Sequence, residues 1–76
     1  MAVTTEEIRS IVEDAETMAD MDTLTNDAPL TEQEVDSLDM ANIYLLTEEK
    51  LGVKISDKDI AGLKSIDDIV TYLNNK

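Results

Sequence analysis

The stretch EVDSLDM, residues 34–40, contains the side chains that first suggest chemistry: a serine with acidic neighbours. Ser37 follows Asp36 directly and precedes Asp39 by two residues. A serine nucleophile needs a nearby base, which is usually a histidine, and the sequence has no histidine. We therefore expect no catalytic residue of the chain's own. Two interpretations stay open: Ser37 only caps a helix, or a second protein brings the chemistry to it.

Composition limits the class of protein. The chain has 76 residues, a net charge of −12 and 42% hydrophobic residues, which predicts one small domain spanning 1–76 rather than a charged disordered tail. Its negative field should repel nucleic acid and anionic membranes and attract basic protein surfaces. Because the sequence contains no cysteine, it cannot form a disulfide or a thiolate metal site, and we expect no metal site of another kind.

The expected location follows from segments that are missing. The first residues, MAVTTEEI, have neither the basic start nor the apolar run of a signal peptide. No segment approaches the roughly 20 apolar residues of a membrane span. We expect a monomer in the cytoplasm or inside an organelle, with no membrane contact.

The first periodic stretch predicts a helix from about Thr5 to about Met21. Thr4 and Glu7 have the spacing of a capping box at its start. Apolar residues then recur on one face, and the opposite face is polar and expected to be solvated. The apolar face holds Ile8, Ile11, Val12 and Ala15, extended by Met18 and Ala19, and the polar face holds Glu6, Arg9, Glu13 and Glu16.

Helical periodicity lapses between Asp22 and Asp36, a stretch that includes the only proline, Pro29. A loop of this length in a small domain is expected to be functional or held in place by its own side chains. Thr31 and Glu34 have capping spacing, which predicts one short helical turn inside it. The expected apolar anchors are Leu24, Leu30 and Val35.

Three further helices follow. The segment SLDMANIYLLTEEKLG predicts a helix that starts at Ser37 and stops at Gly52. A very short helix, capped by Ser56 or Asp57, is expected next. The segment SIDDIVTYLNNK predicts the last helix. The expected fold is all-α: a small four-helix bundle, with three main helices, one short helix and a long first loop. The apolar surface of the second helix is formed by Leu38, Met40, Ala41, Ile43, Tyr44, Leu45 and Leu46.

With these features, the chain resembles the acyl carrier proteins. The hallmark of that family is an Asp-Ser-Leu triplet whose serine carries 4′-phosphopantetheine, and here DSLDM opens a helix in a small acidic chain. The segments EEKLGVKISDKD and LKSIDDIVTYL then follow without a gap, so the resemblance is best from 36 to 73. It implies a stand-alone carrier, not an enzyme. Such a carrier holds acyl intermediates as thioesters and delivers them to fatty-acid, polyketide or other specialised biosynthetic enzymes.

The resemblance also assigns roles to residues. It implies that Ser37 is the attachment site and that a phosphopantetheinyl transferase, with Mg²⁺ and coenzyme A, supplies the missing base. Acidic residues are implied to face basic patches on partner enzymes, and Ile55 to lie at the mouth of an acyl pocket. The implied partner-binding residues are Asp36, Leu38, Asp39, Met40, Glu48, Glu49 and Ile55.

Two alternatives remain. Departures from the family pattern at Glu34, Asn42, Tyr44 and Lys50 alter the recognition face and the pocket, and indicate a specialised carrier as an alternative to the housekeeping fatty-acid pathway. The rival from another class is an acidic helical adaptor or nucleic-acid mimic that binds a basic protein by charge. Ser37 separates these two classes, because an adaptor has no use for a phosphopantetheine arm.

Overall fold

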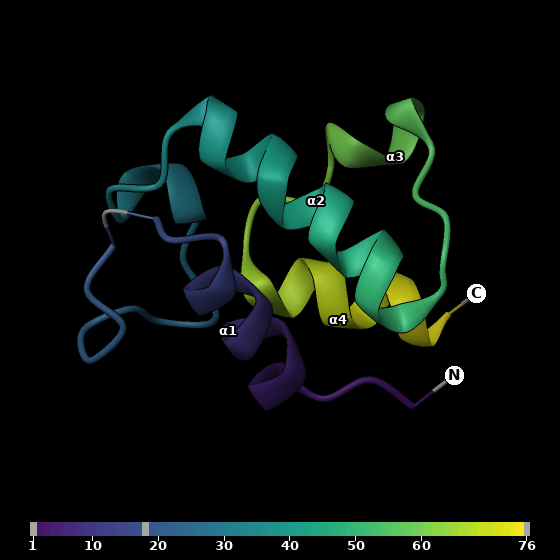
Figure 1. Ribbon diagram of the computed structural model, residues 1–76, viewed down its shortest axis with the longest axis horizontal. Helices are drawn as coiled ribbons and strands as arrows, with labels where there is room; N and C mark the ends of the chain where they lie inside the picture. Colours follow the sequence, from purple (N-terminus) through teal and green to yellow (C-terminus); the bar gives the residue numbers. More distant parts are fainter. Residues whose placement is uncertain (1, 18, 76) are drawn as a thin grey trace.

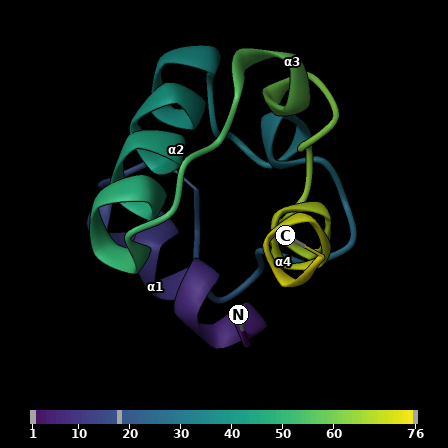
Figure 2. The same ribbon diagram turned by 90° about the vertical axis from the view of Figure 1, so that its right-hand side faces the viewer.

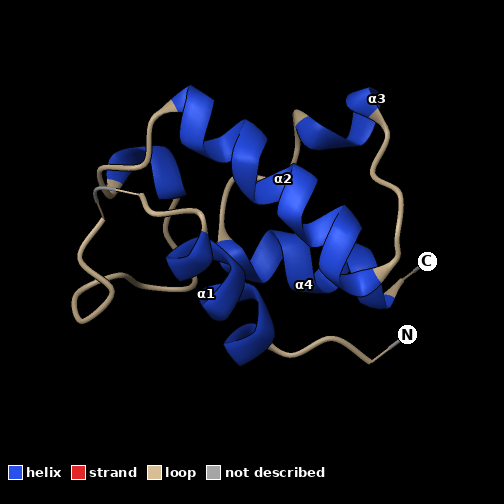
Figure 3. Cartoon of the chain, viewed as in Figure 1, coloured by secondary structure: helices blue, strands red, loops and turns tan. Residues whose placement is uncertain are grey.

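The computed structural model describes residues 2–17 and 19–75, and within these ranges the chain forms helices and loops with no strand (Figures 1 and 3). This confirms the expected all-α fold of three main helices, one short helix and a long first loop. No helix in the described ranges is long and apolar enough to cross a membrane. The elements are α1 (Thr5–Asp14), the 3₁₀ turn η1 (Leu30–Glu32), α2 (Ser37–Leu51), α3 (Asp57–Ile60) and α4 (Ile66–Asn74).

Local capping sets the start of each main helix. The side chains of Thr4, Asp36 and Ser65 each accept a hydrogen bond from a backbone N–H in the first turn of α1, α2 and α4. At α4 the capping box is complete, as the sequence predicts. Helix α2 ends at Gly52, whose φ of 65° lies in the left-handed region that suits glycine.

The predicted end of the first helix at Met21 is wrong, because α1 ends at Asp14. Glu16 has a φ of 54°, and a backbone in that left-handed region cannot continue a right-handed helix. Ala19 and Met21 still pack against the core, now from the loop. Met18, which was expected to extend the apolar face, lies outside the described residues.

Arg9 was expected on the solvated face of α1 and is instead half-buried against the long loop. Its guanidinium donates to the backbone oxygens of Leu24 at 2.8 Å and Met21 at 2.6 Å, and to Oδ1 of Asn26 at 2.9 Å. The planar fork of the guanidinium allows one side chain to reach all three acceptors. Arg9 therefore holds the first part of the loop against α1.

The second part of the loop is held by Gln33 and by the start of α4. The side-chain amide of Gln33 donates to the backbone oxygens of Thr25 at 3.1 Å and Ala28 at 3.0 Å. The N–H of Leu30 donates to the oxygen of Lys64 at 2.8 Å. These bonds explain how so long a connection is ordered in so small a protein.

The predicted short turn exists, with its position corrected. It is the 3₁₀ turn η1, which begins at Leu30 directly after Pro29, so Thr31 lies inside the turn and does not cap it. Glu34 has a φ of 69° and does not continue a right-handed helix. The three expected loop anchors, Leu24, Leu30 and Val35, are all buried.

The helices are arranged around a common core, and Figure 2 shows this arrangement of the helices in a view turned by 90° from Figure 1. Both ends of the described chain lie at one end of the molecule, where the N–H of Val3 donates to Oδ1 of Asn74 at 2.7 Å. The core is almost wholly aliphatic and draws on every main helix and on the loop. Its most deeply buried members include Ile8, Val12, Leu30, Val35, Ile43, Ile66, Ile69 and Leu73.

We predict that Arg9→Ala lowers the free energy of unfolding by about 2–3 kcal/mol, because three acceptors lose a charged donor. Arg9→Lys should recover little of it, since an ammonium cannot reproduce the fork. Chemical denaturation measures both. The matched control is Glu13→Ala on the exposed face of α1, expected within about 0.5 kcal/mol of the wild type. A loss in Arg9→Ala no larger than in the control would contradict this account.

We also predict that added NaCl raises the melting temperature. The net charge is −12, and the described residues contain one salt bridge, between the exposed side chains of Lys50 and Asp14. Screening this repulsion should stabilise the compact state, and each 1 kcal/mol gained should raise Tm by roughly 4–8 °C. Calorimetry at increasing ionic strength tests this, and a Tm that does not change would show that the repulsion is negligible.

Candidate functional site

Ser37 is the first residue of α2, and its side chain is exposed. The capping role belongs to Asp36, whose Oδ1 accepts the N–H of Asp39 at 2.8 Å. The interpretation of Ser37 as only a cap is therefore wrong. Within the described residues its hydroxyl makes no hydrogen bond, and it lies beside the positive end of the helix, where an attached phosphate ester is favoured.

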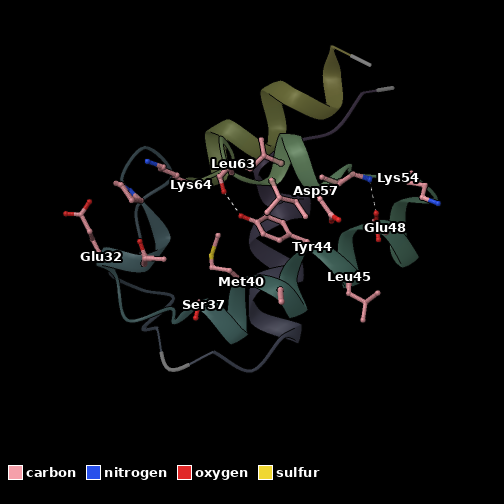
Figure 4. A pocket seen from close by; sticks show the side chains of 16 residues that line it. Glu32, Ser37, Met40, Tyr44, Leu45, Glu48, Lys54, Asp57, Leu63 and Lys64 are labelled. Atoms are coloured by element: carbon pink, nitrogen blue, oxygen red, sulfur yellow. Dashed lines mark hydrogen bonds between the residues drawn. The ribbon is translucent and has the colours of Figure 1, made fainter.

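A cavity of about 850 Å³ lies beside Ser37, between α2 on one side and η1, α3 and their flanking loops on the other (Figure 4). This volume is within the range typical of sites for small molecules. Its wall is mostly apolar, with charged side chains among the lining residues. The lining residues are Pro29, Thr31, Glu32, Ser37, Met40, Ala41, Tyr44, Leu45, Glu48, Lys54, Ile55, Asp57, Ile60, Ala61, Leu63 and Lys64.

Tyr44 is one of the polar residues that line this mostly apolar wall, and the sequence indicated it as a departure from the family pattern but not as a site residue. Its ring is buried, and its hydroxyl donates to the backbone oxygen of Leu63 at 2.5 Å. Burial raises the pKa of the phenol above its ordinary value of 10.0, and the negative charge of Asp68 adds to that shift. The hydroxyl is therefore a proton donor at neutral pH. The only signal in the sequence was a tyrosine at a position often held by an aliphatic residue.

The four acidic residues predicted to face partners divide into two pairs. Asp36 caps α2, and Oε2 of Glu48 accepts the N–H of Ile55 at 2.8 Å, so both carboxylates have structural partners. Within the described residues, the side chains of Asp39 and Glu49 make neither a hydrogen bond nor an ion pair. Asp39 and Glu49 are thus the acids of α2 that remain available to another molecule.

The apolar residues predicted to face partners divide in a similar way. Leu38 is 71% exposed, and Leu45, on the same helix, is 54% exposed. Met40 and Ile55 are buried and line the cavity. The structure therefore brings Leu38 and Glu49 to the surface, leaves Asp39 half-buried, and places Met40 and Ile55 inside with Tyr44.

Comparison with known proteins gives a consistent result. A family model described as a phosphopantetheine attachment site matches residues 6–73. The chain is 39% identical to the meromycolate extension acyl carrier protein of Mycobacterium leprae, over 96% of this chain and 67% of that protein. It is 38% identical to an acyl carrier protein of Rhodococcus erythropolis (88% and 74% covered) and 37% identical to one of Campylobacter hominis (92% and 89%). The chain therefore belongs to the family of phosphopantetheine-carrying acyl carrier proteins.

Proposed function

We propose that Ser37 carries the 4′-phosphopantetheine of this acyl carrier protein and that the cavity beside it holds the acyl chain. The observation that carries the proposal is the exposed hydroxyl of Ser37, which has no hydrogen-bond partner in the part of the chain that the structure describes and lies beside a mostly apolar cavity of about 850 Å³. As a member of its family, the chain is a carrier and not an enzyme. When bound, the arm supplies the thiol that forms the thioester, since the sequence has no cysteine.

The chain's own residues would receive and shield the cargo. Asp36 fixes the start of α2, so the free N–H groups of the first turn are available to the phosphate on Ser37. Met40, Ile55 and Leu63 supply apolar walls. Each methylene group of the acyl chain that is buried against these walls lowers the free energy of the bound chain by about 0.8 kcal/mol, because it leaves water.

Partner enzymes would bind the outer surface of α2. Leu38 and Leu45 expose apolar area there, and Asp39 and Glu49 add negative charge that no described residue pairs. Such a surface suits the phosphopantetheinyl transferase and acyl-processing enzymes with basic docking patches. We reassign Met40 and Ile55 from partner contact to cargo contact, because both are buried.

The pathway is proposed from the relatives. Because the relative from Mycobacterium leprae is a meromycolate extension carrier, we propose that this chain serves fatty-acyl chain extension in the cytoplasm. The negative field of the molecule favours protein partners over nucleic acid and anionic membranes.

Ser37→Ala should abolish modification by a broad-specificity phosphopantetheinyl transferase, because no other serine combines the helix start with the cavity. Intact-mass spectrometry after incubation with coenzyme A and Mg²⁺ measures the increment. The matched control is Ser56→Ala, which removes another exposed serine immediately before a helix and should leave the increment unchanged. An increment that survives in Ser37→Ala, or is absent from the wild type, would overturn the assignment.

Charge reversal should separate a docking surface from general steering. Glu49→Lys should slow loading by the transferase roughly three- to tenfold at low salt, and the effect should shrink as salt screens the charges. The control is Glu13→Lys, which makes the same charge change at an exposed position of α1. Equal slowing by both variants would show that the charge acts diffusely and that α2 is not the docking surface.

A further inference from the structure

Tyr44 stands across the middle of the cavity. Figure 4 shows its ring projecting from α2 toward Leu63, with Ser37 and Met40 on one side and Leu45 and Glu48 on the other. The hydrogen bond from its hydroxyl to the Leu63 oxygen, 2.5 Å long, connects the two walls. We call this contact the Tyr44–Leu63 bond.

Residues that line the single cavity lie on both sides of this bond. We call the side that adjoins Ser37, Met40 and η1 the near chamber, and the side toward Leu45, Glu48 and Lys54 the far chamber. Tyr44 follows Ser37 by seven residues, which places it about 10 Å along the helix axis. An acyl chain that enters beside Ser37 therefore meets the ring before it reaches the far chamber.

Both ends of the bond are held in place. Tyr44 belongs to the second turn of α2, and its ring is buried. Its acceptor precedes Lys64, whose own oxygen accepts the N–H of Leu30 at 2.8 Å, so the connection before α4 is tied to the first loop. Breaking the bond without replacing it would leave a buried hydroxyl unsatisfied.

We propose that Tyr44 is a specificity-determining residue that sets the length of acyl chain the carrier shelters. This inference rests on the proposed function, in which the chain enters the cavity beside Ser37. With the Tyr44–Leu63 bond formed, a short chain fills the near chamber. A longer chain either breaks the bond to enter the far chamber or leaves its end in water, where partner enzymes can reach it.

The test uses a chain attached without any transferase. Because the sequence has no cysteine, Ser37→Cys has a single thiol, which alkyl methanethiosulfonates carrying butyl, octyl, dodecyl or hexadecyl groups convert to mixed disulfides. The melting temperature of each adduct is then measured with Tyr44 intact, in Tyr44→Phe, which keeps the ring without the hydroxyl, and in Tyr44→Leu. The control is Tyr72→Phe, which removes the exposed hydroxyl that donates to Asp59 at 2.6 Å.

With Tyr44 intact, we expect Tm to rise from butyl to octyl and then to stop rising. In Tyr44→Phe and Tyr44→Leu the rise should continue to the longer chains, and Tyr72→Phe should behave as the parent does. The same length dependence in all variants would overturn the role of Tyr44, as would adducts whose Tm is independent of chain length. Failure of the proposed function would appear separately, as wild-type protein that gains no phosphopantetheine at Ser37.

Absorbance gives a second readout that does not depend on stability. In Tyr72→Phe, Tyr44 is the only tyrosine in a chain without tryptophan. Its near-ultraviolet spectrum therefore reports the environment of its ring and hydroxyl. In protein that combines Tyr72→Phe with Ser37→Cys, we expect the tyrosine spectrum to shift when a hexadecyl group is attached to the thiol, and not to shift when a butyl group is attached. No shift with hexadecyl, or equal shifts with both chains, would contradict the division of the cavity.

Discussion

The cap at the start of α2 is the contact on which the rest of the site depends. Because Asp36 satisfies the N–H of Asp39, the helix begins at Ser37, and this register decides where each later side chain points. Ser37 is left exposed and without a hydrogen-bond partner among the described residues, Leu38 points outward, and Tyr44 points into the cavity. One aspartate next to the serine therefore sets the position of Ser37, the outer surface and the inner wall at the same time.

A carrier of this size has to stay folded although it encloses a cavity beside Ser37. A cavity deprives its lining of packing contacts, and a small domain has few such contacts to spare. Contacts of the long loop compensate for this loss: Arg9 and Gln33 hold the loop through hydrogen bonds to backbone oxygens, and Leu30 buries its side chain at the start of η1. The loop thus forms one wall of the cavity without filling it.

The fold could be predicted where short-range chemistry decides it, and the site only in part. The cap at Ser65 and the stop at Gly52 are visible in a few neighbouring residues, and both predictions are confirmed. The early end of α1 depends on a left-handed Glu16, a conformation that glutamate rarely adopts, so spacing alone predicted a longer helix. The contacts of Arg9 and Tyr44 join residues 12 to 19 positions apart, and no local pattern indicates them.

The central claim, that a chain anchored at Ser37 lies in the cavity along α2, is tested most directly by nuclear magnetic resonance. The phosphopantetheinylated protein would carry an isotope-labelled octanoyl thioester, and isotope-filtered nuclear Overhauser effects would locate its methylene protons. Our account predicts contacts from the chain to the ring of Tyr44 and the side chain of Met40, both of which line the cavity. A chain without contacts to either residue, and with the spectrum of the cavity wall unchanged from the unacylated form, would contradict it.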